Sequence, residues 1–276
     1  MSDAATTVAA ALRDAKAQGL DRLDAQLLLA HVLARPRSWL LAHDDAALDD
    51  PQRGAWQALL ARRLTGEPLA YLVGAKEFHG LALQVDANVL VPRPETELLV
   101  DWAIERLMAM SSPDPRVVDL GTGSGAIALA VKHAVPPAQV LATDVDPAAL
   151  QVAQTNARRL GLDIGWRRGS WWSCLAGERF GLILSNPPYI AGGDPHLAAL
   201  RHEPALALTP GGDGLDALRA IVAGAADHLG PGGWLLLEHG HDQADAVQAL
   251  LRAHDFVAIE TRRDLGGRPR CTGARR

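Results

Sequence analysis

Two changes in the hydrophobic pattern divide the chain into three stretches. Up to about residue 72, leucines and alanines recur at helical spacing between glycine and proline breaks, which predicts a bundle of about four short helices. From residue 73 to residue 97 the pattern partly alternates, and Phe78 to Val85 is expected to form a β-hairpin with Val89 to Val91. We therefore expect a helical domain over residues 1–72 and a linker with a β-hairpin over residues 73–97.

Residues 98–276 alternate between short apolar runs and helical patterns, which is typical of an α/β domain with a mostly parallel sheet. The basic tail after Asp264 is expected to add an edge strand. The predicted strands before it are Arg116–Leu120, Gln139–Thr143, Ile164–Arg167, Leu182–Leu184, Trp234–Leu237 and Val257–Glu260. We expect these strands to form one Rossmann-like domain.

The composition is that of an ordinary globular protein, with 48% hydrophobic and 21% charged residues among 276. This length suits a large core and two domains. The formal net charge of −5 argues against a general affinity for nucleic-acid phosphates, although it leaves a local basic patch open. We expect no direct binding of nucleic acid.

No pattern in the chain predicts a membrane or secreted protein. No apolar run reaches the roughly 20 residues that a membrane span needs. The start of the chain carries Asp3 and lacks the basic-then-apolar pattern of a signal peptide. Cys174 and Cys271 have no metal-type spacing and are expected to be reduced thiols. We expect a cytoplasmic protein with no membrane partner and no metal.

The apolar run Leu182–Leu184 ends abruptly in a corner that contains two prolines. Pro187 and Pro188 cannot donate backbone hydrogen bonds, so the strand must stop at the carboxyl edge of the sheet, where α/β folds place their chemistry. The Asn186 side-chain oxygen and the Pro187 carbonyl are two acceptors at fixed spacing, which can receive both hydrogens of a planar NH2 group. Tyr189 offers a flat face for stacking. The corner suits an amide or an exocyclic amine, whereas a lone Asn-Pro usually only ends a strand.

A glycine-rich turn, Gly121-Thr-Gly-Ser-Gly125, connects a predicted strand to a predicted helix. Such glycines let the backbone turn sharply and approach a ligand closely. The third glycine falls one residue earlier than in the dinucleotide fingerprint, which disfavours NAD. Asp144 ends the next strand, where it can accept from both ribose hydroxyls of an adenosine-type ligand. Arg93 lies between two prolines, and is either an exposed linker residue or a residue that faces a ligand.

These motifs together resemble a class I S-adenosylmethionine-dependent methyltransferase, whose domain has a mostly parallel seven-stranded sheet. Further motifs resemble the peptide chain release factor N5-glutamine methyltransferase (PrmC/HemK) family, and this resemblance covers essentially the whole chain. They are Glu77-Phe78, Pro92-Arg-Pro-Glu-Thr-Glu97, Asp194-Pro-His196, Glu203-Pro204 and Leu237-Glu-His-Gly240.

The resemblance implies methyl transfer from S-adenosyl-L-methionine to the glutamine amide nitrogen of the Gly-Gly-Gln motif in class 1 release factors, which tunes translation termination. S-adenosyl-L-homocysteine would be the product, the release factor the partner, and residues 1–72 a recognition domain. No catalytic His or Cys is expected.

The resemblance also implies roles for individual residues, although Ser170 stands where the family commonly has an acid. The cofactor's methionine and ribose would lie against Gly121, Thr122, Gly123, Ser124 and Gly125. Asp144 would hold the ribose hydroxyls, Trp171 would lie near the adenine, and Asn186 would border the cofactor. The catalytic, glutamine-binding set would be Asn186, Pro187, Pro188 and Tyr189, with Arg93 as a further substrate contact.

Two other readings of the motifs remain open. Adenine's exocyclic amine is also planar, so an N6-adenine methyltransferase acting on nucleic acid could use the same corner. The acidic balance and the lack of an evident basic target-recognition insert disfavour it. The fold could also serve as a non-catalytic binding module that recognises a protein through residues 1–70. The intact glycine-rich turn and the Asn186 corner disfavour that alternative.

Overall fold

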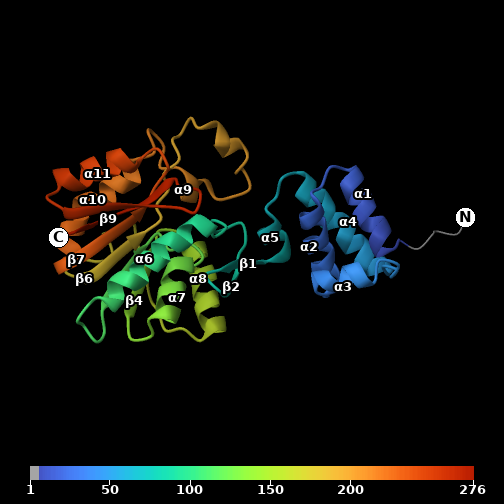
Figure 1. Ribbon diagram of the computed structural model, residues 1–276, viewed down its shortest axis with the longest axis horizontal. Helices are drawn as coiled ribbons and strands as arrows, with labels where there is room; N and C mark the ends of the chain where they lie inside the picture. The colour runs from blue at the N-terminus through green and yellow to red at the C-terminus, as the bar shows by residue number, and fades with distance from the viewer. Residues whose placement is uncertain (1–5) are drawn as a thin grey trace, which may run out of the picture. The chain divides into compact units, whose positions relative to one another are not determined.

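The computed structural model describes residues 6–276, which divide into two compact units, one ending at Ala75 and one spanning Lys76–Arg276 (Figure 1). Asp3, on which the expectation of no signal peptide rests, lies outside the described residues. The expected division into residues 1–72, 73–97 and 98–276 stays a prediction.

The first unit is helical, and side-chain caps begin three of the five helices among its described residues. The side chain of Asp21 accepts a hydrogen bond from Leu23 N at 2.7 Å, and Asp49 and Gln52 form a capping box. Trp56 is buried in the apolar core of this unit. The unit contains the predicted helices and the short helix α5 in addition. The helices are α1 (Val8–Ala17), α2 (Arg22–Leu33), α3 (Arg37–Ala42), α4 (Asp50–Leu64) and α5 (Leu69–Val73).

The β-hairpin differs from the prediction in its partner strand. It consists of β1 (Ala75–Phe78) and β2 (Leu81–Gln84), and Val89–Val91 forms no strand. Two residues, His79 and Gly80, connect the strands, and their φ angles are 48° and 77°. Positive φ at both positions is the requirement of a tight type I′ turn, so the chain reverses before it reaches Val89. The expected pairing with Val89–Val91 was therefore wrong.

The second unit contains a seven-stranded sheet in the order β5-β4-β3-β6-β7-β9-β8. The five strands from β5 to β7 in this order run parallel, and β9 is antiparallel to its two neighbours. The predicted Rossmann-like fold is confirmed. The parallel strands are β3 (Arg116–Leu120), β4 (Gln139–Asp144), β5 (Gly165–Arg168), β6 (Phe180–Ser185) and β7 (Leu229–Glu238).

The last strand is not at the edge of the sheet, which corrects the prediction for the basic tail. β9 (Pro269–Arg275) lies between β7 and β8 (Val257–Arg263), so β8 is the edge. Gly273 of β9 makes room for the fully buried Trp102, because a Cβ atom at Gly273 would lie 2.6 Å from Trp102 Cη2. Tertiary packing thus places this strand inside the sheet.

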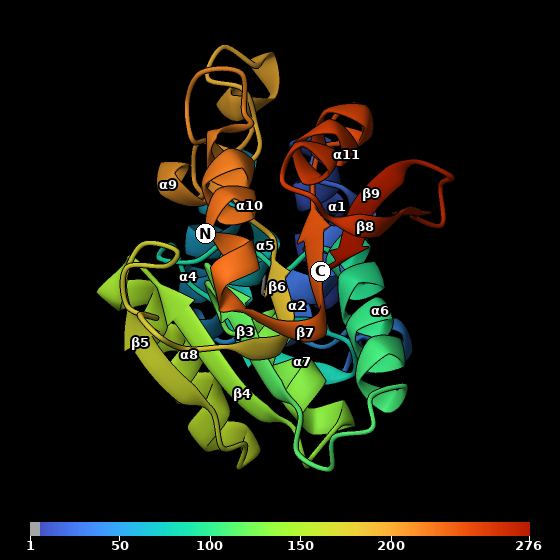
Figure 2. The ribbon, with the colours of Figure 1, turned by 90° about the vertical axis from the view of Figure 1, so that its left-hand side faces the viewer.

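Helices cover both faces of the sheet (Figure 2). The 3₁₀-helix η1 (Pro94–Thr96) leads into α6 (Glu97–Met108), which with α7 (Ala126–Ala134) and α8 (Pro147–Leu160) contributes to one apolar core. A second core contains residues of α10 (Asp216–His228) and α11 (Ala244–Ala253). Between β6 and α10 the chain forms only η2 (Pro195–Ala198) and α9 (Ala205–Leu208).

The strand order puts a topological switch point between β3 and β6. From β3 the chain continues to β4 and β5 on one side, and then to β6 and β7 on the other. Open α/β sheets bind their ligands at the carboxyl ends of the strands beside such a point. Within residues 6–276, no helix has the length and apolar character to span a membrane.

Candidate functional site

A cavity of about 430 Å³ opens at the carboxyl ends of the parallel strands. It is lined by residues that follow β3, β4, β5 and β6, by the segment before α6, and by the segment around α9. Most of the predicted site residues meet here, namely Arg93, Gly121, Thr122, Gly123, Ser124, Asp144, Trp171, Asn186 and Pro188. Gly125, Pro187 and Tyr189 do not line the cavity.

The glycine-rich turn forms the floor of a cradle at the end of β3. Gly121, Gly123 and Gly125 have φ angles of 71°, 55° and 83°, which other residues rarely adopt. A Cβ atom at Gly125 would lie 3.2 Å from the Ala153 Cβ, so this glycine lets α7 pack close to α8. At Gly123 a Cβ atom would meet nothing within 4 Å and would occupy space beside the cavity. The turn therefore brings bare backbone to a ligand.

The carboxylate of Asp144 fixes this turn from the neighbouring strand. Its two oxygens accept hydrogen bonds from Gly123 N and Asp146 N, each at 2.9 Å. Burial raises the pKa of Asp144, while these two hydrogen bonds lower it. Asp146 caps α8 by accepting from Ala148 N at 2.8 Å. Asp144 thus organises the turn and also lines the cavity.

Trp171 and Trp172 have different environments. Trp171 lines the cavity beside Gly121, where an added Cβ atom would lie 3.5 Å from the Trp171 ring, and Ser170 also lines the cavity. Trp172 instead stacks on His228 with 4.6 Å between ring centroids, and its Nε1 donates to Ala220 O at 3.0 Å. The structure therefore places an aromatic face in the cavity through Trp171.

These features fit the adenosine-type cofactor that the sequence resemblance implies. Gly123 leaves open space that a side chain would fill, Asp144 presents carboxylate oxygens, and Trp171 presents a flat face. A carboxylate can accept from ribose hydroxyls, and an aromatic ring can stack on a planar base. The donor and acceptor types thus match the groups of such a molecule.

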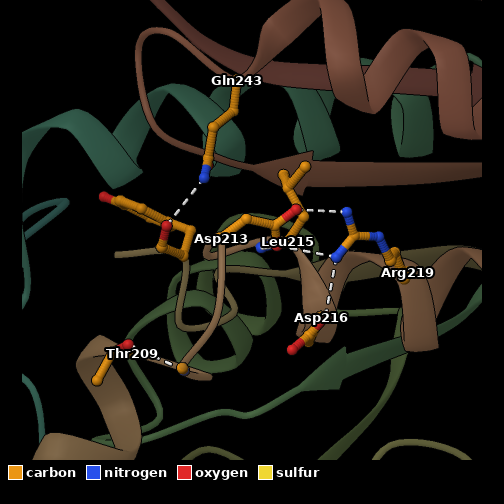
Figure 3. Close-up of polar contacts among 8 residues, drawn as sticks. Thr209, Asp213, Leu215, Asp216, Arg219 and Gln243 are labelled. Atoms are coloured by element: carbon orange, nitrogen blue, oxygen red, sulfur yellow. Dashed lines mark hydrogen bonds and ion pairs between the residues drawn. The ribbon is translucent and has the colours of Figure 1, made fainter. Parts of the chain in front are cut away.

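The corner after β6 is held by side chains from three directions. Ser185 Oγ donates to Leu120 O at 2.7 Å, which joins the ends of β6 and β3. Asn186 Nδ2 donates to Thr96 Oγ1 at 3.1 Å. Gln243 Nε2 donates to the carbonyl oxygen of Tyr189 at 2.9 Å, from the start of α11 (Figure 3). Asn186 is half-buried at the cavity, whereas Pro187 is buried.

The Tyr189 ring is directed to a buried acid rather than to the cavity wall. Its hydroxyl donates to Glu238 Oε1 at 3.3 Å. Burial and the charge of Glu238 raise the pKa of Tyr189 well above its ordinary value, so the phenol keeps its proton. Burial also raises the pKa of Glu238 to about 7, although the charge of Arg270 and the hydroxyl groups of Thr96 and Tyr189 lower it. The corner therefore contacts a carboxyl group that titrates near neutrality.

The segment around α9 closes one side of the cavity and is tied down at both ends. Glu203 accepts from Val91 N at 3.0 Å and pairs with the guanidinium group of Arg93. After α9, Arg219 bonds to Asp213 and Asp216 (Figure 3). Arg93 thus lines the cavity with its charge already compensated by Glu203, and its role toward substrate stays a prediction.

Four residues of this arrangement had no role in the sequence analysis: Thr96, Glu203, Glu238 and Gln243. The first three lie in motifs that carried the family resemblance, and those motifs were the available signal. Their contacts join segments far apart in the chain, so no spacing rule could pair them. Within residues 6–276, no group of three or more His, Cys, Asp or Glu side chains is placed to hold a metal ion.

Asp119 is a second buried carboxyl group at the same edge of the sheet. It is fully buried at the end of β3, and Thr122 Oγ1 donates to its Oδ2 at 2.6 Å. Burial raises the pKa of Asp119 to about 7, against the hydrogen bond from Thr122. Asp119 therefore binds the Thr122 side chain of the glycine-rich turn, and its carboxyl group stays protonated to a higher pH than an exposed acid does.

Two family models match the chain. The PrmC N-terminal domain model matches residues 3–74, and the Methyltransferase small domain model matches residues 96–262. Together they account for the helical unit and for most of the unit that contains the cavity.

The chain is also similar to curated proteins over nearly its whole length. A release factor glutamine methyltransferase of Bordetella pertussis is 51% identical, covering 92% of this chain and 95% of that protein. Its namesake in Xylella fastidiosa is 51% identical, covering 96% and 97%. A T. thermophilus 16S rRNA N2 G1207 methyltransferase, solved with AdoMet and guanosine, matches the fold with a TM-score of 0.56 at 23% identity. That match covers 73% of this chain and 49% of the other.

The buried acid Asp119 generates a testable dependence of stability on pH. Its pKa of about 7 in the folded state exceeds the unfolded value, so the folded state binds the proton more readily. The wild-type protein therefore gains stability from this group as the pH falls from about 8 to about 6, whereas Asp119→Asn cannot titrate. The free energy of unfolding of the variant minus that of the wild type should be larger at the higher pH, by about 1.4 kcal/mol.

Urea denaturation at the two pH values measures this difference. Asp163→Asn is the matched control, because Asp163 is exposed. The free energy of unfolding of this variant minus that of the wild type should be the same at both pH values. An Asp119→Asn difference that is equal at both pH values would show that Asp119 ionises normally in the folded protein.

Proposed function

The chain belongs to the release factor glutamine methyltransferase family, and from this premise we propose that it methylates a glutamine side-chain amide in class 1 peptide chain release factors. The methyl donor would be S-adenosyl-L-methionine and the acceptor the N5 nitrogen of the Gly-Gly-Gln glutamine. One observation carries the proposal. Asn186 uses its Nδ2 on Thr96 and therefore has its side-chain oxygen available at the cavity, beside the glycine-rich turn.

An amide nitrogen is a poor nucleophile, because its lone pair is delocalised into the carbonyl group. The Asn186 side-chain oxygen lies at the cavity and can accept one N–H of the glutamine amide. The carbonyl of Pro187, a buried residue outside the cavity lining, would have to be reached by the other N–H. These two hydrogen bonds would orient the nitrogen and stabilise the positive charge that develops on it. Because the acceptors sit on a corner stiffened by two prolines, positioning supplies much of the catalysis.

S-adenosyl-L-methionine supplies an electrophilic methyl group on its sulfonium when it is bound. The residues that would hold it are those of the glycine-rich turn, together with Asp144 for the ribose hydroxyls and Trp171 for the adenine. The methylated nitrogen is acidic and loses its proton without a dedicated strong base. We accordingly assign no catalytic role to a His or Cys side chain.

The partner of the enzyme would be the release factor itself, with residues 1–72 as the recognition domain. Arg93 lines the cavity and lies in the same segment as Thr96, the hydrogen-bond partner of Asn186. It is the proposed further contact with the substrate. We propose a cytoplasmic location, where the release factors act. The free thiols Cys174 and Cys271 are consistent with a reducing compartment.

The reaction is tested by transfer of labelled methyl from S-adenosyl-L-methionine, with purified release factor and unmethylated DNA offered side by side. We expect label on the release factor alone, and mass spectrometry should place it on the Gly-Gly-Gln glutamine. Label on adenine would instead show that the protein is an N6-adenine methyltransferase. Label on neither substrate would contradict both enzymatic assignments and favour a binding role.

Asn186→Ala tests the residue that carries the proposal. Removing one preorganised polar group of this kind costs about 2.7–4 kcal/mol of transition-state stabilisation, so the turnover number should fall by about 10²–10³. The affinity for S-adenosyl-L-homocysteine should change little, which calorimetry of the same variant would verify. A fall of less than tenfold with saturating release factor would remove Asn186 from the mechanism.

Asp144→Asn tests the cofactor end of the cavity. A hydrogen bond to a charged group contributes about 1.5–3 kcal/mol, so S-adenosyl-L-homocysteine should bind about 10- to 100-fold more weakly. Asp163→Asn again provides the control, since it removes an equal charge from an exposed position outside the cavity. Equal dissociation constants for the two variants in calorimetry would contradict the assignment of Asp144.

A further inference from the structure

A buried carboxylate lies directly behind the corner that holds Asn186. Glu238 ends β7, the strand next to β6, and is only 1% exposed. Its Oε1 accepts from the Tyr189 hydroxyl at 3.3 Å. Its Oε2 has no partner of standard hydrogen-bond geometry among the described residues. Burying a carboxylate in this way is costly, so its surroundings should show what it does.

Thr96 connects this acid to Asn186. It is 4% exposed, and its backbone N donates to Arg93 O at 3.1 Å, which holds the residue in η1. Its hydroxyl oxygen accepts from Asn186 Nδ2 at 3.1 Å, and its hydroxyl group lowers the pKa of the buried Glu238 carboxyl. A hydroxyl group has one hydrogen to donate. The group that accepts this hydrogen therefore decides which other partner of Thr96 must act as a donor.

An ionised carboxylate can only accept hydrogen bonds. A Thr96 hydroxyl hydrogen directed to this carboxylate would leave the Thr96 oxygen as an acceptor, as its hydrogen bond from Asn186 Nδ2 requires. Only the NH2 end of the Asn186 carboxamide can satisfy that acceptor, so the carbonyl end must face the cavity. We propose that Glu238 and Thr96 are positioning residues that set the orientation of the Asn186 carboxamide and so make this corner an acceptor of N–H groups.

The orientation matters because the two ends of a carboxamide are nearly equal in size but opposite in hydrogen-bonding character. With its oxygen toward the cavity, Asn186 can receive an N–H of a glutamine amide. With the group turned over, it would present NH2 to NH2, and the substrate amide would lose its acceptor. This inference rests on the proposed function for its substrate, but the orientation itself is a property of the free protein.

Tyr189 and Gln243 stabilise the same corner without deciding that orientation. Tyr189 donates to Glu238, and its backbone carbonyl accepts from Gln243 Nε2 at 2.9 Å. Both contacts hold the main chain after Pro188 in place, and neither reaches the Asn186 side chain. Thr96 is thus the residue whose hydroxyl can be removed to test the orientation alone.

The test compares Thr96→Val, which keeps the shape but removes the hydroxyl, with Thr96→Ser, which retains it. Methyl transfer to the release factor is measured near pH 8, above the pKa of Glu238 of about 7. We expect Thr96→Val to lower kcat by about ten- to a hundredfold, because the acceptor is no longer held in one orientation. The KM for the release factor and the Kd for S-adenosyl-L-homocysteine should change by less than about threefold.

Thr96→Ser should restore most of the lost turnover. Thr155→Val in α8 is the matched control, since the Thr155 hydroxyl bonds only within its own helix. A kcat of Thr96→Val within about twofold of the wild type, or an equal loss in the serine variant, would overturn the proposal. Thr96→Ala replaces the valine variant if that chain does not fold.

A second measurement needs no substrate and separates this inference from the proposed function. In NMR spectra of the ¹⁵N-labelled free protein, the Asn186 side-chain NH2 pair is assigned by its loss in Asn186→Ala. One of its protons should show the downfield position of a hydrogen-bonded amide in the wild type and in Thr96→Ser, and should move upfield in Thr96→Val. Unchanged signals in Thr96→Val would overturn the orientation. A wild type that does not methylate the release factor would instead refute the proposed substrate.

Discussion

Two consecutive prolines end β6 inside a parallel sheet, and the rest of the site depends on that ending. Pro187 and Pro188 have no N–H to offer a neighbouring strand, so the chain must leave the sheet directly after Ser185. Because β6 lies between β3 and β7, the chain leaves at the switch point, next to the glycine-rich turn. Asn186 then reaches the cavity while Tyr189 contacts the interior of the domain.

Two buried acids support this edge of the sheet, one on each side of β6. Asp119 at the end of β3 and Glu238 at the end of β7 are almost completely inaccessible, and burial raises the pKa of each to about 7. Such groups reduce stability when they ionise. Asp119 bonds to the Thr122 hydroxyl and Glu238 to the Tyr189 hydroxyl. The two costly buried carboxyl groups therefore lie where polar groups of the site must be oriented.

The sequence predicted the elements whose pattern is local. Strands β3, β4 and β6 were recognisable because a parallel strand covered by helices on both faces reads as a continuous apolar run. Two predictions failed where the answer was not local. The turn at His79-Gly80 reversed the chain before Val89 could pair, and β9 lies inside the sheet beside β7, where Gly273 leaves room for Trp102. The alternation of apolar and polar residues along a segment predicts neither the position of that turn nor the place of β9 in the sheet.

The sequence by itself determined the glycine-rich turn, the acid at Asp144 and the proline corner at Asn186, because each depends on what a residue and its immediate neighbours can do. Only the tertiary structure decided which end of the Asn186 carboxamide faces the cavity. Its partner Thr96 is 90 residues away in the chain, and the carboxylate of Glu238 comes from a third segment. A carboxamide is nearly symmetric in shape, so its orientation follows from the hydrogen bonds that the fold places around it.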